Sequence, residues 1–394
     1  MPRTQDASWL QVLETLIRYV FNFVSIVLIS SAFLRGKSLV KSVVRQKVLI
    51  VYLLWISSSL FWTTSISNTL SEYIRFLVTT SIAVYLAQTT PPETFFSLLK
   101  KALFASLFFS ILVCIFLPGY GIMEQRSSVG PLWQGIFNHK NSLGYVAALS
   151  TSVFFVSLLF IERRSAFFDV LGVILSIFMI FKSGSGTALV SSALIISVGA
   201  ALRVFQKFPK HFFGFSLFAG LALISVFVFD PKILSILSVV GKDDTFTGRT
   251  AIWSGALEAI QSRPLTGFGL RGFFLPSYRE SSLPYPGDDL VARLQWPVPN
   301  AHNAFLQVLL DLGLVGLLMF SALLIKALRK ALRLNFSHDQ SQRAQRLWPI
   351  VVLSLALIYS VTEIDLYLPA SGWVCLVFIL SAKFERPRVH AKNL

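Results

Sequence analysis

Long apolar runs constrain what this chain can fold into more than any other feature of its sequence. A run of about 20 apolar residues can cross a bilayer as a helix, and we identify about eleven such runs. They cover residues 12–34, 48–66, 70–88, 99–117, 142–161, 167–182, 186–204, 212–229, 312–330, 347–362 and 365–382. Only 14% of the 394 residues are charged, which excludes an ordinary soluble enzyme, a disordered protein and a coiled coil. The sequence therefore predicts an all-α, polytopic membrane protein.

The positive charge of the chain predicts how these helices are oriented. The net charge is +16, and the Lys and Arg residues gather in alternate loops. These basic loops are 35–47, 89–101, 162–166, 203–211, 326–346 and the C-terminus from 383. The positive-inside rule places them in the cytoplasm and the long segment 230–301, whose bases and acids balance, outside. Topology and lipid headgroups thus explain the basic surplus, and we expect no nucleic-acid partner.

The span pattern divides the chain into three parts. Residues 1–229 hold the first eight predicted transmembrane helices, and residues 230–311 form one large extracytoplasmic loop with short helices. Residues 312–394 hold the last three helices and a cytoplasmic tail. The loop is too long to serve only as a connector, so we expect it to carry function. The two cysteines, Cys114 and Cys375, lie in apolar runs, and no disulfide framework is expected.

Charged residues within or beside the spans are expensive in a bilayer and are therefore functional candidates. Glu72 and Arg75 are spaced to pair with each other on one helix. Glu363 and Asp365 lie at the predicted outer junction of the last two spans and have no partner nearby in the sequence. They are candidates for binding an acceptor or for a structural role.

A polar triplet precedes the fifth span. His139, Lys140 and Asn141 are consecutive, and Asn141 or Ser142 is predicted to cap the helix. The positive end of that helix beside a lysine suits an anion. The alternative is a lysine that extends to the membrane interface beside an ordinary helix cap.

The long loop contains three further arginines of interest. Residues 247–260 have the apolar spacing of a short amphipathic helix, with Thr247 as its expected cap and Arg249 in its first turn. A cation there opposes the helix dipole at a cost of about 0.3–1 kcal/mol, which a bound anion would offset. A turn at 264–269 ends this helix, and Arg271 and Arg279 follow it.

The end of the loop offers a candidate base. Residues 300–312 have helical spacing, with Asn300 as the expected cap and Gly313 as the expected stop. This spacing predicts that His302 lies in the first turn, where the helix dipole favours a neutral imidazole that can accept a proton. The alternative is a histidine that only caps the helix or bonds a loop carbonyl.

Three stretches in a fixed order resemble the O-antigen ligase and O-antigen/exopolysaccharide polymerase family of polytopic glycosyltransferases. They are residues 135–144, then 249–253 with 264–269, then His302 and Asn303 followed by Gly313 and Gly316. The resemblance covers most of 118–330, together with the long loop and the number of spans. It implies a glycosyltransferase C-like membrane architecture in a bacterial inner membrane, without a metal or another cofactor.

The resemblance also implies a reaction and a set of roles. A glycan would move from a polyprenyl-diphosphate carrier, such as undecaprenyl diphosphate, to a sugar hydroxyl. His302 would be the general base and Arg249 would bind the diphosphate, with Lys140 and Arg271 as further candidates for that binding. Asn303, Glu363, Asp365 and Arg279 would contact the acceptor or serve the structure. The expected partners are the carrier-linked donor, the glycan acceptor, the bilayer and, as a further candidate, a chain-length regulator.

The residue chemistry agrees with this reaction. A diphosphate leaving group needs its charge neutralised, which Arg and Lys can do without Mg²⁺. The acceptor hydroxyl needs a base, and a single displacement would invert the anomeric carbon. Polymerisation of repeat units is favoured over ligation to lipid A-core, and a transporter or flippase and a non-catalytic scaffold are the alternatives from other classes. Catalysis requires that Arg249 and His302 face one common cavity.

Overall fold

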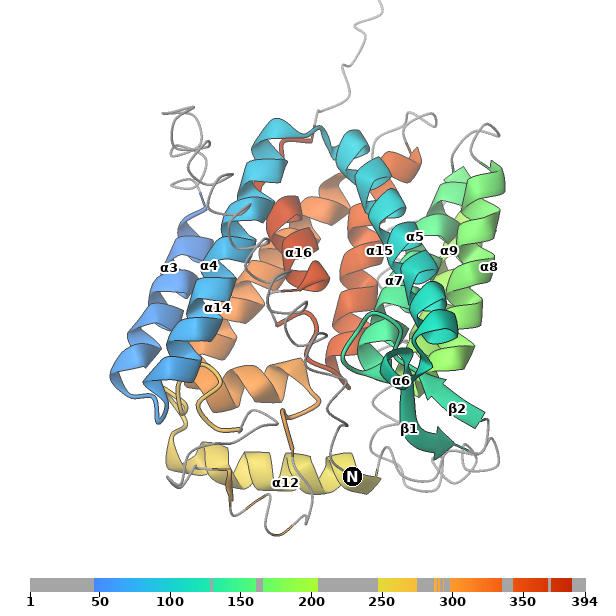
Figure 1. Ribbon diagram of the computed structural model, residues 1–394. Helices are drawn as coiled ribbons and strands as arrows, with labels where there is room; N and C mark the ends of the chain where they lie inside the picture. The colour runs from blue at the N-terminus through green and yellow to red at the C-terminus, as the bar shows by residue number, and fades with distance from the viewer. Residues whose placement is uncertain are drawn as a thin grey trace, which may run out of the picture.

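The protein is a bundle of membrane-type helices, seen here in a computed structural model (Figure 1). The structure describes residues 46–127, 130–160, 166–204, 247–274, 287, 288, 290, 293, 298–334, 343–367 and 370–384. The predicted spans 12–34 and 212–229 and the candidate Arg279 lie outside the described residues.

Each predicted span that falls within the described residues contains a helix, although the last one, 365–382, is helical only over Ser371–Ser381. The helices are α3 (Lys47–Ser58, continued by the 3-10 turn η2, Ser59–Phe61), α4 (Ile66–Thr89), α5 (Pro92–Phe116), α7 (Lys140–Phe160), α8 (Ala166–Ser183), α9 (Gly186–Val204), α14 (Ala304–Leu334), α15 (Arg343–Ser360) and α16 (Ser371–Ser381). By length and composition, five helices of the described part can cross a membrane, namely α4, α5, α7, α8 and α14. The chain is thus a multi-pass membrane protein, as its hydropathy predicts.

The helix ends form two opposite faces of the bundle (Figure 1). The lower face carries α12 (Thr247–Ser262), which lies across the ends of the spanning helices. The same face carries α6 (Pro118–Gly121) and a hairpin of β1 (Ile122–Ser127) and β2 (Gly130–Trp133). We call this face the site end. The hairpin corrects the all-α prediction, because two short strands outside the apolar runs leave no trace in hydropathy.

The helix α7 lies at the centre of the right-hand half of the bundle, packed against α5, α8, α9 and α15. Most residues of this helix are buried inside the protein. Its small residues permit this close packing, and the hydroxyls of Ser150, Thr151 and Ser152 donate to carbonyls four residues earlier. Glycine completes the fit, because a Cβ on Gly172 of α8 would lie 2.6 Å from the ring of Phe154.

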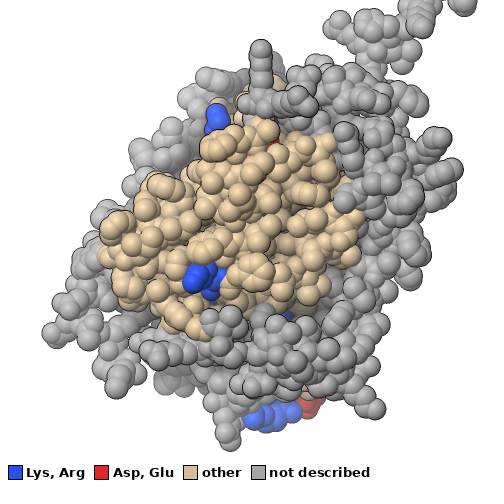
Figure 2. Space-filling model, turned by 90° about the vertical axis from the view of Figure 1, so that its right-hand side faces the viewer, with Lys and Arg blue, Asp and Glu red and all other residues tan. Residues whose placement is uncertain are grey.

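The outward faces of α5 and α8 are apolar. Their exposed side chains include Phe108, Phe109, Ile115, Phe116, Phe167, Ile174, Phe178 and Phe181. Figure 2 shows that the described part of this side of the molecule has very few charged side chains. Such a surface is stable in contact with lipid chains rather than water, which agrees with the membrane assignment.

The helix α14 breaks at Gly313, where the sequence predicts a helix stop, and resumes beyond it. Gly313 has a φ of 66° and lies so close to Leu265 that a Cβ would clash with the backbone there. The loop after α12 satisfies the backbone groups that the break frees: Phe268 and Gly269 donate to the carbonyls of Leu310 and Asp311. The predicted turn at 264–269 therefore ends α12 and also docks it onto α14. Because α14 begins at Ala304, it crosses the predicted boundary between loop and span at 311 and 312.

Candidate active site

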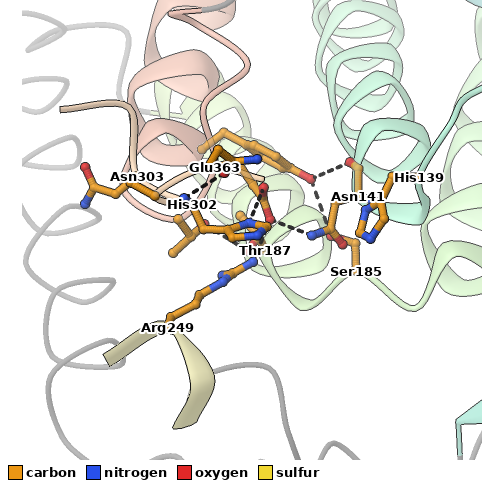
Figure 3. Close-up of polar contacts among 12 residues, drawn as sticks. His139, Asn141, Ser185, Thr187, Arg249, His302, Asn303 and Glu363 are labelled. Atoms are coloured by element: carbon orange, nitrogen blue, oxygen red, sulfur yellow. Dashed lines mark hydrogen bonds and ion pairs between the residues drawn. The ribbon is translucent and has the colours of Figure 1, made fainter. Parts of the chain in front are cut away.

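One carboxylate, that of Glu363, joins three segments that lie far apart in the sequence (Figure 3). Its Oε1 accepts a bond from the Arg249 guanidinium at 2.6 Å and from the Asn141 amide at 2.6 Å. Its Oε2 lies 3.2 Å from Nδ1 of His302. A carboxylate only accepts, so Nδ1 carries a proton, and in the neutral ring Nε2 is then the nitrogen with the lone pair. We call these four residues the Glu363 cluster.

The helix α12 places Arg249 in this cluster. Ile252, Trp253 and Ala256 are buried against the bundle, whereas Leu257 of the predicted stripe is half exposed and points away from it. Arg249 itself is only 7% exposed, in the first turn of the helix as predicted. A guanidinium at that depth needs a charged partner, and Glu363 provides one.

The segment before α14 presents His302. Asn303, not the predicted Asn300, caps the helix: its side chain accepts bonds from the amides of Phe305 and Leu306. Asn300 instead accepts a bond from the amide of His302. His302 consequently lies just before the helix rather than in its first turn. Its φ of 46° costs about 1–3 kcal/mol and persists only where its surroundings hold it.

The cap of α14 also connects two segments of the site. The side-chain amide of Asn303 donates to the carbonyl of Val361, which lies two residues before Glu363 in the sequence. Asn303 therefore links the segments of His302 and Glu363.

The start of α7 completes the cluster. The imidazole of His139, not Asn141 or Ser142, caps this helix by accepting a bond from the amide of Asn141 at 3.1 Å. The Asn141 side chain is thereby free to reach Glu363. The main-chain carbonyl of Asn141 accepts a bond from the hydroxyl of Tyr359. Lys140 lies within electrostatic range of Arg249 and Glu363. Its ammonium forms no hydrogen bond or ion pair with the part of the chain that the structure describes.

The electrostatics of the site follow from burial and from these contacts. Burial by itself raises the pKa of Glu363, but the hydrogen bond from His302 and the charge of Arg249 hold that pKa below its usual value. Burial and the charge of Glu363 raise the pKa of the neighbouring Asp365 to about 8. Glu363 is therefore an anion and Asp365 a neutral acid near pH 7. Two cations against one carboxylate leave the site positive before the imidazoles are counted.

Arg271 lies in a different environment. It contributes a main-chain hydrogen bond and its positive charge to Asp311, a fully buried residue of α14. Like His302 it has a positive φ, here 56°. The structure thus brings Arg249, His302 and Glu363 into direct contact with Lys140 nearby, while the main chain of Arg271 bonds a second carboxylate, that of Asp311.

Several contact residues are absent from the sequence-based candidates. In the sequence, Asn141 is predicted as a helix cap, Ser185 falls in a turn between two predicted spans, and Thr187, Tyr359 and Thr362 lie at the ends of predicted spans. In the structure Thr187 and Thr362 share a hydrogen bond of 2.9 Å, and Ser185 and Tyr359 are 3.3 Å apart. No local pattern identifies them, because they come together only where the turn between α8 and α9 meets the end of α15.

Comparisons with known proteins point to one family. Residues 171–321 match the family model described as "O-Antigen ligase". The "Exopolysaccharide production protein ExoQ" of Rhizobium meliloti is 24% identical over 261 residues, which is 64% of this chain and 59% of that protein. The "Putative polysaccharide ligase RC0486" of Rickettsia conorii is 27% identical over 149 residues, which is 36% of this chain and 34% of that protein. The chain thus spans less than two thirds of the length of either relative.

The family match covers only part of the site. Arg249, Arg271 and His302 lie within the matched residues, whereas Lys140 and Glu363 lie outside them. The fold brings these two parts of the sequence together.

Proposed function

We propose that this membrane protein, which is similar to the O-antigen ligase family over residues 171–321, is a glycosyltransferase that moves a glycan from a polyprenyl-diphosphate carrier to a sugar hydroxyl. The observation that carries this proposal is the Glu363 cluster, in which an imidazole and a guanidinium from separate segments meet on one carboxylate. Carrier-linked transfer needs a base for the acceptor and a cation for the leaving diphosphate, and the cluster offers both.

His302 is the base in this proposal. Its Nε2 makes no hydrogen bond with the described residues, and the side chain is 22% exposed. The acceptor hydroxyl gives its proton to Nε2 as its oxygen bonds to the anomeric carbon. The bond from that carbon to the phosphate oxygen breaks, and its electron pair leaves with the diphosphate. Glu363 holds the ring orientation and stabilises the imidazolium that forms. The displacement inverts the anomeric carbon.

Lys140 and Arg249 are the diphosphate ligands in this proposal. Arg249 is already paired with Glu363, so Lys140 supplies the charge that no described carboxylate neutralises. A bound diphosphate would share the Arg249 guanidinium, whose several donors can serve two anions at once. Arg271, whose main chain donates to Asp311, remains a further candidate for this role.

The orientation follows from the charges at the other face of the bundle. The helix ends away from the site end carry Lys47 of α3, Lys101 of α5, Lys326, Arg329, Lys330 and Arg333 of α14, and Lys383 after α16. Bases outnumber acids there, and we therefore place that face and the C-terminus in the cytoplasm and the site end outside. The carrier lipid would then lie against the apolar outward faces of α5 and α8, with its diphosphate at the membrane interface beside α12.

Polymerisation of repeat units is the favoured form of this reaction. The longer of the two alignments is to a protein named for exopolysaccharide production, which supports polymerisation. Similarity to the ligase family model and to a protein named as a polysaccharide ligase makes ligation the second candidate.

The test is reconstitution of the full chain in liposomes with a carrier-linked glycan and its acceptor. We expect His302→Ala to lower the transfer rate about 10²–10⁴-fold, as loss of a general base does. Size-exclusion elution and melting temperature serve as the controls for folding. A rate equal to that of the wild-type protein would remove His302 from the mechanism.

A gene deletion distinguishes the two forms of the reaction. Loss of long surface chains with single repeat units retained indicates a polymerase. Free polymer that is missing from lipid A-core indicates a ligase.

A further inference from the structure

A second buried set of polar side chains lies beside the Glu363 cluster. Gln307 and Asp311 are one helical turn apart in α14, and both are completely buried. The amide nitrogen of Gln307 donates to Asp311 Oδ1 at 2.9 Å, and the hydroxyl of Tyr367 donates to Asp311 Oδ2 at 3.0 Å. None of the three is needed as a base or as a diphosphate ligand, so their burial requires another explanation.

The residue before His302 is held from both sides. The amide of Ala301 donates to the side-chain oxygen of Gln307 at 2.8 Å, and the carbonyl of Ala301 accepts from the indole of Trp253 at 2.8 Å. His302 then enters its left-handed conformation with its own amide bonded to Asn300. A histidine adopts a positive φ stably only where fixed neighbours impose it, and the two bonds at Ala301 are such neighbours.

Asp311 determines which way the Gln307 amide points. A carboxylate accepts and a backbone amide donates, so only one orientation of Gln307 serves both Asp311 and Ala301. In that orientation its nitrogen faces Asp311 and its oxygen faces Ala301. Without Asp311, the Gln307 amide would lose the acceptor that fixes its nitrogen, and only the Ala301 amide would then orient its oxygen.

The same carboxylate contacts the other two segments of the site. Tyr367 belongs to the loop that carries Glu363, and Arg271 belongs to the loop that follows the helix of Arg249. Asp311 therefore binds, through one buried group, each of the three segments that supply Arg249, His302 and Glu363.

We propose that Gln307 and Asp311 are positioning residues that set the place of the His302 imidazole relative to Glu363 and the acceptor. This inference rests on the proposed function, in which His302 is the base. Neither residue touches substrate. Both act through the backbone of Ala301, so their loss displaces the base without removing a ligand for the donor.

The main variant is Gln307→Leu, which keeps the volume and removes the acceptor for Ala301. We expect kcat to fall about 10–10²-fold with the KM for the donor nearly unchanged, because a displacement of about 1 Å suffices for such a loss. Hydrogen exchange at the 298–303 backbone should become faster in the same variant. Gln88→Leu is the matched control: it removes a glutamine that donates to the carbonyl of Ser381 at the far face of the bundle. It should change neither quantity.

The double variant Gln307→Glu with Asp311→Asn, which exchanges the two side-chain types, tests the hydrogen bonds that connect Asp311 through Gln307 to Ala301. The carboxylate introduced at position 307 still accepts from Ala301, and the amide introduced at position 311 donates to it, so every hydrogen bond can form with donor and acceptor exchanged. We expect kcat to recover to within about fivefold of wild type and the exchange of 298–303 to return to its slow rate. If Gln307→Leu yields no folded protein, this double variant decides alone, and kcat below about a tenth of wild type would overturn the inference.

The outcomes separate this inference from the proposed function. A wild-type protein without transfer activity, or a fully active His302→Ala, overturns the proposed function. An inactive His302→Ala together with wild-type kcat in Gln307→Leu overturns only the positioning role. Lower kcat with unchanged exchange at 298–303 also overturns it, since the backbone of Ala301 would then not be the link.

Discussion

Two buried ion pairs of the described structure share the same chemistry and differ in what surrounds them. Lys100 of α5 pairs with Asp169 of α8, and both also bond the hydroxyl of Ser157 in α7. Arg249 and Glu363 pair at the site end with similar burial. The first pair is surrounded by side chains of the helices, namely the hydroxyl of Ser157 and the rings of Phe96 and Phe154.

The second pair is open to further partners. Glu363 also bonds the half-buried imidazole of His302, whose Nε2 faces no described acceptor or donor, and Lys140 remains without a described counterion. The comparison indicates that a buried ion pair alone does not identify a site. A pair becomes a candidate site when it holds a reactive group whose bonding capacity is incomplete.

Removal of both partners of each pair should break the comparison most clearly. Replacing Arg249 by Met together with Glu363 by Leu removes both charges of the pair at once, so the protein should remain folded. We expect transfer activity to fall about 10³-fold or more, because both the phosphate ligand and the partner of His302 are lost. The matched control is Lys100→Met with Asp169→Leu, which should keep wild-type activity per folded molecule. Equal losses in the two double variants would contradict the comparison.

Single removal at the far pair should act on stability instead. Lys100→Met removes the ammonium that pairs with the buried carboxylate of Asp169, which costs about 3–5 kcal/mol of unfolding free energy. The double variant at this pair should regain most of that loss. Melting temperature in detergent measures both. Unchanged stability in the single variant would show that Ser157 and water suffice for Asp169.

Glu363→Gln sharpens the comparison within the site. The amide keeps the shape and removes the charge, so the imidazolium is no longer stabilised and either ring nitrogen can carry the proton. We expect kcat to fall about 10²-fold, with a smaller change in the donor KM. The pH profile of kcat is the accompanying measurement. A profile and rate like those of wild type would show that Glu363 only holds Arg249.

Asp365 should give the smallest effect, on pH dependence. Its pKa is raised from 3.8 to about 8, so between these values the folded state keeps a proton that the unfolded chain has released. The stabilisation from this group is complete below about pH 4 and is lost as pH rises toward 8. Asp365→Asn should therefore melt progressively higher relative to wild type as pH rises from 4 to 8.

An exposed carboxylate is the control for that series. Glu258 pairs with Arg293 at the surface, where both side chains are more than half exposed. Glu258→Gln should shift the melting temperature little at any pH, because exposed pairs contribute little. A parallel shift in both variants would assign the effect to net charge rather than to burial of Asp365.

The pattern of apolar residues predicted much of the fold. It located nine helices that the structure describes, five of them long and apolar enough to cross a membrane, together with the short helix of Arg249, the turn after it and the break at Gly313. It failed at the hairpin of β1 and β2 and at both helix caps, where His139 and Asn303 act in place of the expected residues. Cap assignment depends on a difference of one or two residues, and several polar side chains in a row can each fill the position.

The candidate site was predicted in its members but not in its connections. Arg249 and His302 were singled out by chemistry at the start of predicted helices, and Glu363 by being charged without a local partner. The structure shows that Glu363 contacts both Arg249 and His302. It also shows that Asp311 and Gln307 support these contacts. These contacts join distant segments: Arg249 and Glu363, for example, are more than a hundred residues apart in the sequence. Spacing along the chain carries no information about such contacts.

The sequence by itself determined that this chain enters a membrane, which segments become helices and which side chains carry chemistry, because hydropathy and residue type are local properties. The tertiary structure alone decided which carboxylate Lys100 and Arg249 each meet, which nitrogen of His302 faces Glu363 and which of the two buried ion pairs also contacts an imidazole. Those outcomes depend on how helices pack, and packing joins residues that the sequence keeps apart.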